Sequence, residues 1–280
     1  MQKLWKRFRR RWLMNHADVH LISFPKCGRT WLVLMLSKAI ELHHGVVIDN
    51  PLKLRRYTRR VEGLPMMLQH HDGGPEFKRI EELEQDKSFY AGSKVVFLVR
   101  DPRDVTVSAY YQKTKRNINF SGTLKEYVYE PVGSIRTNIA FYNVWARNRH
   151  VPRDFLLITY EDLHRDAVAE LRRLVRFVGL DDVSNATLSA AVDACSFENM
   201  RRMESTNALR SGRLAPRDAD DEQTYKTREG RIGGYRDYLD TEEIRHIDEL
   251  IDETLDDDYW FYKSGTLNRP QCPTSSGSKR

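Results

Sequence analysis

Three short apolar runs, at residues 19–24, 94–100 and 155–160, stand out from the more polar remainder of the chain. Each is rich in β-branched or aromatic residues, and each is followed by a stretch with helical character. Apolar strands that alternate with helices are typical of a parallel sheet covered on both faces. The pattern therefore predicts an α/β fold with three layers, in which a central parallel β-sheet is flanked by helices.

Helical spacing of apolar residues supports this interpretation. An amphipathic helix is predicted from Thr30, and the stretch after the third run keeps helical spacing up to Gly179, a suitable stop. A late helix over residues 241–255 has Asp240 and Glu243 placed as a capping box. Together with the strands, these helices predict one domain over residues 16–265.

Three segments lie outside this regular pattern. Residues 204–234 are polar and without periodicity, as in lids, binding loops or disordered segments. Residues 1–15 form a basic N-terminal arm, and residues 266–280, rich in Ser, Pro and Gly, are expected to be a flexible tail.

The arm accounts for the charge of the whole chain. The formal net charge is +6, and residues 1–12 contain six basic and no acidic side chains. The rest of the chain is neutral overall, so no nucleic-acid partner is expected. The arm, with its tryptophans, is a candidate for weak contact with an anionic membrane surface. A solvated terminus, or a first helix docked by its aromatic residues, is the alternative we favour.

Composition also bears on location and on metals. No stretch reaches the roughly 20 apolar residues of a membrane-spanning helix, and the basic start is not followed by the apolar core of a signal peptide. The cysteines, Cys27, Cys195 and Cys272, are odd in number and far apart, as expected of free thiols in a reducing compartment. No Cys or His cluster has metal-ligand spacing. We therefore expect a cytoplasmic protein without a metal site.

The turn after the first apolar run has the chemistry of an anion site. There the chain passes through Pro-Lys-Cys-Gly into a helix, which directs backbone N–H groups and the positive helix end at one point. Lys26 and Arg29 add charge, and Thr30 adds a hydroxyl group. The ATP-binding loop G-x-x-x-x-G-K-[ST] is only partly matched, because Ser23 replaces its first Gly and Arg29 its Lys. A phosphate or sulfate site is predicted, and a standard NTPase is disfavoured without being excluded.

A second anion site is predicted after the second run. Arg100 stands at the carboxyl edge of the expected sheet, and Ser108 lies on the first turns of the helix that follows. An arginine fork beside a hydroxyl group suits an anion. The alternative is that Arg100 pairs with Asp101 or Asp104 and only stabilises the turn.

A third segment, residues 227–235, places arginines beside glycines, so that backbone and guanidinium groups can approach a ligand together. The alternative here is a glycine-rich turn with solvated arginines. Taken with the other two segments, it indicates a ligand with two separated anionic ends.

At this point the motifs resemble those of the sulfotransferases that use 3′-phosphoadenosine 5′-phosphosulfate (PAPS). Five segments match in the family's order: 24–31 (FPKCGRTW) its 5′-phosphosulfate loop, 100–108 its 3′-phosphate motif, 160–162 (YED), 196–200 (SFENM) its SFxxM segment, and 228–233 its RKGxxG element. The resemblance implies the P-loop-like sulfotransferase fold and PAPS as co-substrate.

The resemblance also implies a set of site residues. The residues expected to bind PAPS are Pro25, Lys26, Cys27, Gly28, Arg29, Thr30, Trp31, Arg100, Ser108, Tyr160, Phe197, Arg228, Glu229 and Gly230. Among them, Lys26 is expected to stabilise the leaving phosphate oxygen. The residues expected around the adenine are Trp31, Tyr160 and Phe197. Lys26, Ser108 and His71 are the residues expected to act in catalysis.

The general base is the least defined of these roles. The family often places a histidine within a KTH segment at a strand end, which corresponds here to residues 67–72 (MLQHHD), with Gln69 in place of the lysine. Because neighbouring strand residues face opposite sides, only one of His70 and His71 is expected to face the site. His71 is favoured, with Asp72 orienting its ring. The alternative is that both are surface residues and an acidic residue is the base.

Two further departures from the family pattern are Cys27, in place of a serine, and Glu229, in place of a lysine that Arg231 could replace functionally. The dimer motif of the animal cytosolic enzymes is missing, which leaves the oligomeric state open. The sequence thus predicts sulfuryl transfer from PAPS to a hydroxyl group of a glycan or small molecule. A P-loop nucleotide kinase or phosphotransferase, and a non-catalytic nucleotide- or polyanion-binding protein, are the alternatives.

Overall fold

The computed structural model describes residues 5, 12–209 and 214–264. The flexible tail predicted over 266–280, with Cys272, and most of the basic arm lie outside the described residues. Among the residues described, no helix combines the length and the apolar character needed to cross a membrane.

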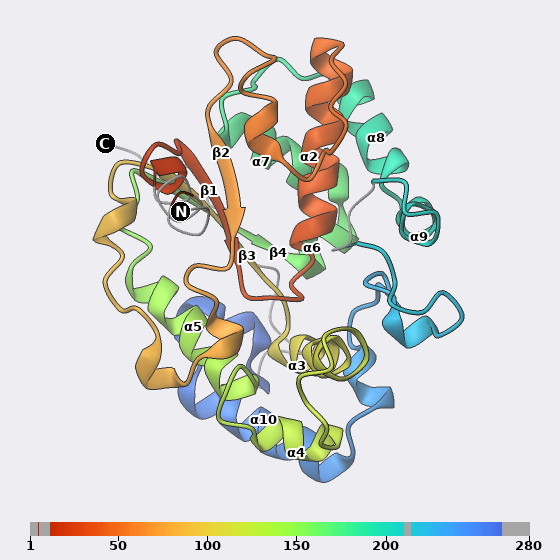
Figure 1. The fold of residues 1–280 in the computed structure, drawn as a ribbon. Helices are drawn as coiled ribbons and strands as arrows, with labels where there is room; N and C mark the ends of the chain where they lie inside the picture. The colour runs from red at the N-terminus through yellow and green to blue at the C-terminus, as the bar shows by residue number, and fades with distance from the viewer. Residues whose placement is uncertain (1–4, 6–11, 210–213, 265–280) are drawn as a thin grey trace.

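A parallel sheet of four strands forms the centre of the molecule, in the order β2-β1-β3-β4 (Figure 1). The strands are β1 (Val19–Ser23), β2 (Met67–His70), β3 (Lys94–Val99) and β4 (Asp154–Thr159). The three predicted apolar runs are β1, β3 and β4, each with its end within one residue of the prediction. Because all four strands run in one direction, their carboxyl ends bring the following loops to one edge.

The helices form two groups on opposite faces of this sheet, which confirms the three-layer α/β fold (Figure 1). One group contains α2 (Arg29–His44), α6 (Tyr160–Arg165), α7 (Ala167–Phe177) and α8 (Asn185–Ala194). The other contains α3 (Pro102–Tyr111), α4 (Leu124–Tyr129), α5 (Ile135–Arg147) and α10 (Thr241–Thr254). The short helix α9 (Phe197–Ser205) follows α8, and a single π-helical turn (Gln112–Arg116) extends α3.

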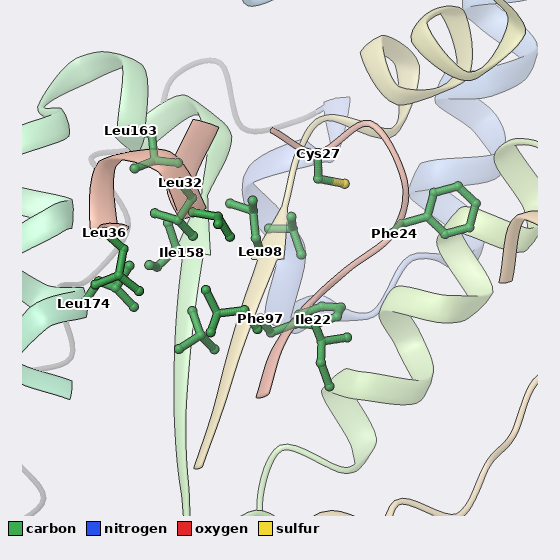
Figure 2. Packing of buried hydrophobic residues seen from close by; sticks show 14 of the residues in the cluster. Ile22, Phe24, Cys27, Leu32, Leu36, Phe97, Leu98, Ile158, Leu163 and Leu174 are labelled. Atoms are coloured by element: carbon green, nitrogen blue, oxygen red, sulfur yellow. The ribbon is translucent and has the colours of Figure 1, made fainter. Parts of the chain in front are cut away.

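The core fills both interfaces between the sheet and the helices (Figure 2). On one face, Phe97 of β3 lies 5.8 Å from Phe141 and 5.5 Å from Trp145 of α5, measured between ring centroids. On the other, Leu98 and Ile158 lie toward Leu32 of α2. Burial on both faces explains why β1 and β3 are nearly continuous apolar runs rather than alternating ones.

Local sequence signals set the helix ends. The capping box of Asp240 and Glu243 opens α10, as predicted. The periodic stretch after β4, in contrast, is divided into α6 and α7 at Asp166, whose side chain accepts a hydrogen bond from the backbone N–H of Ala169 (2.9 Å). An aspartate that bonds to the backbone favours a new helix start over continuation of the first helix. Gly179 follows α7 with φ +91°, as expected of a stop.

Candidate active site

A cavity of about 1280 Å³ opens at the carboxyl edge of the sheet. Its walls come from the loops after all four strands, from the π-helical turn and from the segment 214–235. Every residue that the resemblance placed in the site lines this cavity, with the exception of Cys27. The polar segment 204–234 therefore serves as one wall of the cavity over its described part. Lining the cavity places these residues together, and their individual roles stay predictions.

The loop between β1 and α2 contains two residues with positive φ angles, a backbone conformation that few residues other than glycine adopt. Gly28 has φ +88°, and a Cβ atom there would lie 2.6 Å from the ring of Tyr160. Lys26 also has a positive φ, +75°, which is unfavourable for a residue with a side chain. Its carbonyl oxygen accepts a hydrogen bond from Arg100 Nη1 (3.4 Å). The neighbouring loop thus helps to hold a strained peptide at the cavity.

The side chain of Lys26 donates a hydrogen bond to Gln112 Oε1 (3.2 Å). Burial lowers the pKa of Lys26 well below its usual value, and the nearby cations Lys226, Arg116 and Arg100 lower it further, against the opposing effect of Glu204. A lysine in such surroundings gains from a bound anion, which would favour its charged form. The site is therefore electrostatically prepared for a negative ligand.

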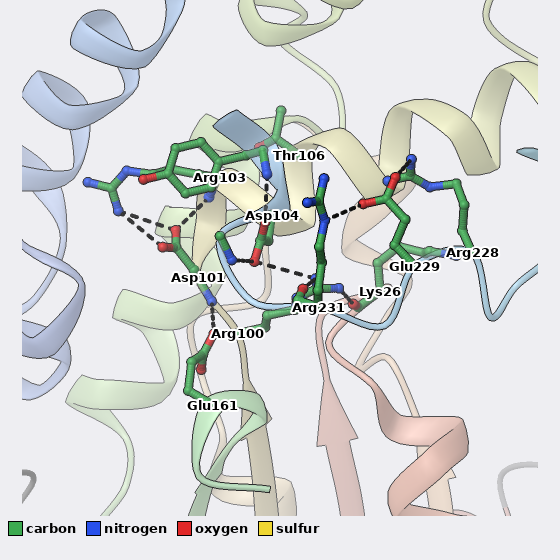
Figure 3. Close-up of polar contacts among 12 residues, drawn as sticks. Lys26, Arg100, Asp101, Arg103, Asp104, Thr106, Glu161, Arg228, Glu229 and Arg231 are labelled. Carbon is green, nitrogen blue, oxygen red and sulfur yellow. Dashed lines mark hydrogen bonds and ion pairs between the residues drawn. The ribbon is translucent and has the colours of Figure 1, made fainter. Parts of the chain in front are cut away.

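Arg100 connects three segments at the centre of Figure 3. Its Nη2 donates to the carbonyl oxygen of Arg231 (2.9 Å) and lies 3.4 Å from Asp104 Oδ2, while its guanidinium stacks 4.2 Å from the ring centre of Tyr160. The pairing with Asp104, which the sequence left as the alternative, is thus present, and Arg100 also lines the cavity. Ser108 lines it as well.

Asp104 was not predicted as part of the site, yet its side chain joins the start of α3 to the third segment, residues 227–235. The carboxylate is almost fully buried and accepts hydrogen bonds from the backbone N–H groups of Gly233 (2.9 Å) and Tyr235 (3.0 Å) (Figure 3). Beside it, Glu161 accepts a hydrogen bond from the N–H of Asp101 (3.0 Å), and burial raises the pKa of Glu161 to about 7. The acidic residues of the Arg-Asp-Pro-Arg-Asp and Tyr-Glu-Asp motifs thus position the loops.

The side chain of Cys27 does not face the cavity, so the prediction that it binds the cofactor finds no support for its side chain. Its sulfur is fully buried and lies 3.2 Å from the hydroxyl oxygen of Tyr142. Burial raises the pKa of the Cys27 thiol to about 12, so the thiol keeps its proton. The Tyr142 hydroxyl donates to the carbonyl of Arg100 (3.0 Å) and accepts from its N–H (3.0 Å). Cys27 therefore donates to Tyr142 and joins the first loop to the second through the core.

The third segment brings Arg228, Glu229 and Gly230 to the cavity. Arg228 donates to Glu229 Oε1 (2.7 Å) and to the Tyr238 hydroxyl (2.6 Å), and its guanidinium lies 4.4 Å from the ring centre of Tyr111 and 4.7 Å from that of Tyr238. Figure 3 shows Glu229 between Arg228 and Arg231, the latter 2.9 Å away. In place of a family lysine, this carboxylate engages two arginines of the segment.

The predicted adenine-binding residues also line the cavity. Trp31 Nε1 donates to the carbonyl of Cys195 (2.9 Å), and its ring lies 6.1 Å from that of Tyr160. Phe197 is 46% exposed, and a Cβ atom at Gly230 would lie 2.4 Å from its ring. Glycine is therefore required where the third segment passes Phe197. The exposure of Phe197 also argues against a role in the core.

Glu204, which sequence reasoning missed, holds the start of the third segment through its backbone N–H groups. The carboxylate is fully buried, accepts hydrogen bonds from the backbone N–H groups of Lys226 and Thr227 (2.9 Å for Thr227), and lies 3.3 Å from Arg116 Nη1. Nothing in the local sequence marks this glutamate, because its partners are more than twenty residues away along the chain.

Replacing Glu204 with glutamine is expected to lower the free energy of unfolding by about 3–5 kcal/mol, because it leaves the buried Arg116 without its counter-charge. Urea denaturation followed by fluorescence measures this change. Glu242 is the matched control, since its pair with Lys125 is more than half exposed on both sides and Glu242→Gln should leave the free energy of unfolding almost unchanged. Equal effects of the two substitutions would contradict this role of Glu204.

The two adjacent histidines at the end of β2, His70 within the strand and His71 just after it, have different surroundings. His71 lines the cavity; its Nδ1 lies 2.8 Å from the carbonyl oxygen of Ser23 and its Nε2 lies 2.8 Å from Arg29 Nη2. The Nε2 atom of His70 lies 3.0 Å from Nδ1 of the buried His20. Of the two, His71 is the one placed to act on a ligand, and its role as a base stays a prediction.

The expected orienting role of Asp72 is wrong. Its carboxylate lies 2.8 Å from Lys87 Nζ and accepts a hydrogen bond from the Tyr90 hydroxyl (2.5 Å), on the side of the buried histidine pair. The positive φ of Asp72 turns its side chain away from the direction that an extended strand would give. The ring of His71 is oriented instead by the carbonyl of Ser23 and by Arg29. No group of metal-ligand side chains was found within the described part of the chain.

Comparison with known proteins agrees with this arrangement. The family model for the sulfotransferase domain matches residues 16–258. Flavonol 3-sulfotransferase of Flaveria bidentis is 26% identical, over 85% of this chain and 81% of its own length. Cytosolic sulfotransferase 7 of Arabidopsis thaliana is 24% identical, over 89% of this chain and 82% of its own length.

Among solved structures, retinol dehydratase in complex with androsterone and the inactive cofactor PAP superimposes with a TM-score of 0.61 at 19% identity, covering 86% of this chain and 81% of the other. That likeness shows the fold, and the family model covers most of the chain. The chain belongs to the sulfotransferase family.

Proposed function

We propose that the protein transfers the sulfuryl group of PAPS to a hydroxyl group of a small-molecule or glycan acceptor. The observation that carries the proposal is that basic groups from different loops line one cavity. Lys26 comes from the loop after β1, Arg100 from the loop after β3, and Arg228 from the third segment. A nucleotide with phosphate groups at both its 3′ and 5′ positions needs two such groups. The relative of known structure that is named as a complex with PAP supports this choice of nucleotide.

The cavity fits such a nucleotide in two further respects. Gly28 and Gly230 leave room where a Cβ atom would collide with Tyr160 and Phe197, so that backbone can approach a ligand closely beside two aromatic rings. The volume of about 1280 Å³ exceeds the roughly 300–1,000 Å³ of most single-ligand sites, which leaves space for an acceptor beside the nucleotide.

The residues can carry out an in-line transfer. The acceptor oxygen forms a bond to sulfur as the bond from sulfur to the 5′-phosphate oxygen breaks, and that oxygen keeps the electron pair. His71 Nε2 takes the acceptor proton, and the ammonium group of Lys26 stabilises the charge on the departing phosphate oxygen. Arg100, Ser108 and Arg228 hold the 3′-phosphate.

The acceptor end of the cavity, around His71, is polar. Asn50, Gln69 and Glu76 line the cavity together with Leu52. Burial raises the pKa of Glu76, and among the described residues its buried Oε2 atom has no hydrogen-bond partner. A hydroxyl group of the acceptor would satisfy that oxygen. We therefore infer an acceptor with several hydroxyl groups, sugar-like or a polar small molecule.

The nucleotide can be tested before the acceptor is known. Thermal unfolding is measured with adenosine 3′,5′-bisphosphate (PAP) and, in parallel, with ATP and Mg²⁺. A ligand that binds only the folded state raises the unfolding temperature. PAP is expected to stabilise the protein more than ATP does. Stronger stabilisation by ATP would favour the nucleotide kinase that the sequence left open.

The affinity for PAP is expected to fall as the pH rises. The depressed pKa of Lys26 in the empty site is raised by a bound anion, so binding takes up a proton at any pH between the two values. Below the lower value this lysine is charged in both states and contributes no dependence. Above it the affinity falls by up to about tenfold per pH unit. Calorimetry in buffers of different ionisation enthalpy measures the uptake, which Lys26→Met should abolish.

The cytoplasmic location stays a prediction, supported by relatives that are named cytosolic sulfotransferases. The basic arm, with its predicted membrane contact, lies largely outside the described residues.

A further inference from the structure

Arg29 belongs to the first loop by sequence, but its side chain contacts the predicted base. Its Nη2 atom lies 2.8 Å from Nε2 of His71. The other ring nitrogen of His71, Nδ1, lies 2.8 Å from the carbonyl oxygen of Ser23. Both partners come from one short stretch, the end of β1 and the start of α2, whose turn also carries Lys26.

These contacts determine the tautomer of the imidazole. A carbonyl oxygen can only accept a hydrogen bond, so Nδ1 of His71 carries the proton. A guanidinium group can only donate, so Nε2 presents its lone pair to Arg29. A base needs that lone pair, and the two contacts keep it on Nε2.

The contact with Arg29 also covers the lone pair. An acceptor hydroxyl that gives its proton to Nε2 must take the place of the guanidinium N–H at that atom. Glu76 also lines the cavity, and its carboxylate interacts electrostatically with Arg29. It offers the displaced guanidinium a counter-charge close by.

We propose that Arg29 is a positioning residue for the base: it holds His71 with the Nε2 lone pair toward the cavity and yields that atom to the acceptor hydroxyl. The proposal rests on the proposed function in taking His71 as the base. It differs from the role that the resemblance implies for Arg29, which is contact with the nucleotide. The two roles make different predictions for PAP binding.

The contact can be tested by NMR without an acceptor. In protein with ¹⁵N-labelled histidine, the ring nitrogens of His71 report both tautomer and protonation, and His71→Gln identifies its signals. The wild type is expected to show the tautomer protonated at Nδ1. In Arg29→Met the loss of the adjacent cation should move the titration midpoint of His71 upward by about one pH unit. Arg29→Lys keeps a cation at this position, so its midpoint should lie closer to that of the wild type.

The same variants separate this role from nucleotide binding. PAP should bind Arg29→Met within about threefold of the wild-type affinity, and Arg176→Met, a change at an exposed residue of α7, should alter neither quantity. An unchanged titration of His71 in Arg29→Met, or a tenfold or larger loss of PAP affinity, would overturn the proposal. Because neither readout requires turnover, the result is independent of whether an acceptor is sulfated.

Discussion

Replacing Lys26 with alanine is expected to lower kcat for sulfuryl transfer by about 10²–10³-fold. In the proposed mechanism its ammonium group stabilises the charge that develops on the departing phosphate oxygen, and the substitution removes that stabilisation. The side chain contacts Gln112 alone among the hydrogen bonds identified for it, so its removal should leave the fold intact. Initial rates with saturating PAPS, together with the unfolding temperature, measure both effects.

Lys125 provides the control for this substitution. It is half exposed and pairs with Glu242 on the surface, away from the cavity, so Lys125→Ala should leave kcat unchanged. A Lys26→Ala protein that keeps its fold and turns over at near wild-type rate would show that another group stabilises the leaving oxygen. A loss of fold in Lys26→Ala, in contrast, would point to the strained backbone at this position as the cause.

Replacing His71 with alanine is expected to lower kcat by about 10²–10⁴-fold, the usual contribution of a positioned base. PAP binding should persist, because the residues expected to hold its phosphates lie on other loops. Binding is measured by calorimetry and turnover by the release of PAP from PAPS.

The adjacent His70 offers the contrasting variant. Its ring accepts a hydrogen bond from the N–H of Asp72 (3.1 Å) and contacts the buried His20, so His70→Ala should lower the unfolding temperature and leave the kcat of the folded protein close to wild type. If His71→Ala keeps near-normal turnover, the base lies elsewhere, and Glu76 becomes the first residue to replace.

Much of the fold was predictable because its signals are local. Apolar runs mark β1, β3 and β4, so these strands were located from the sequence alone; β1 and β3 are almost wholly buried, whereas the edge strand β4 is buried only at its last two residues. The edge strand β2 is short and only partly buried, and it carries no such run; it was expected only from the family resemblance. The division between α6 and α7 was missed because the apolar spacing continues across Asp166.

The residues predicted for the site, Cys27 excepted, line one cavity, and their roles stay predictions, whereas the family and fold are confirmed. What the sequence did not predict is how the loops are held. Asp104 binds backbone groups of residues 233 and 235, and Glu204 binds those of residues 226 and 227. The side chain of Cys27 turns inward to Tyr142. These contacts join residues far apart in the chain, so the spacing of residues within a motif cannot predict them.

The measurement that tests the account most directly is incubation of the protein with PAPS labelled in its sulfuryl group and a panel of hydroxyl compounds that includes sugars, polar small molecules, phenols and steroids. The account predicts that label moves to at least one acceptor with release of one PAP per sulfate transferred, and that Lys26→Ala and His71→Ala lose this transfer while still binding PAP. Transfer at equal rates by wild type and both variants, or a wild type that binds PAP tightly and transfers no label to any acceptor, would contradict it.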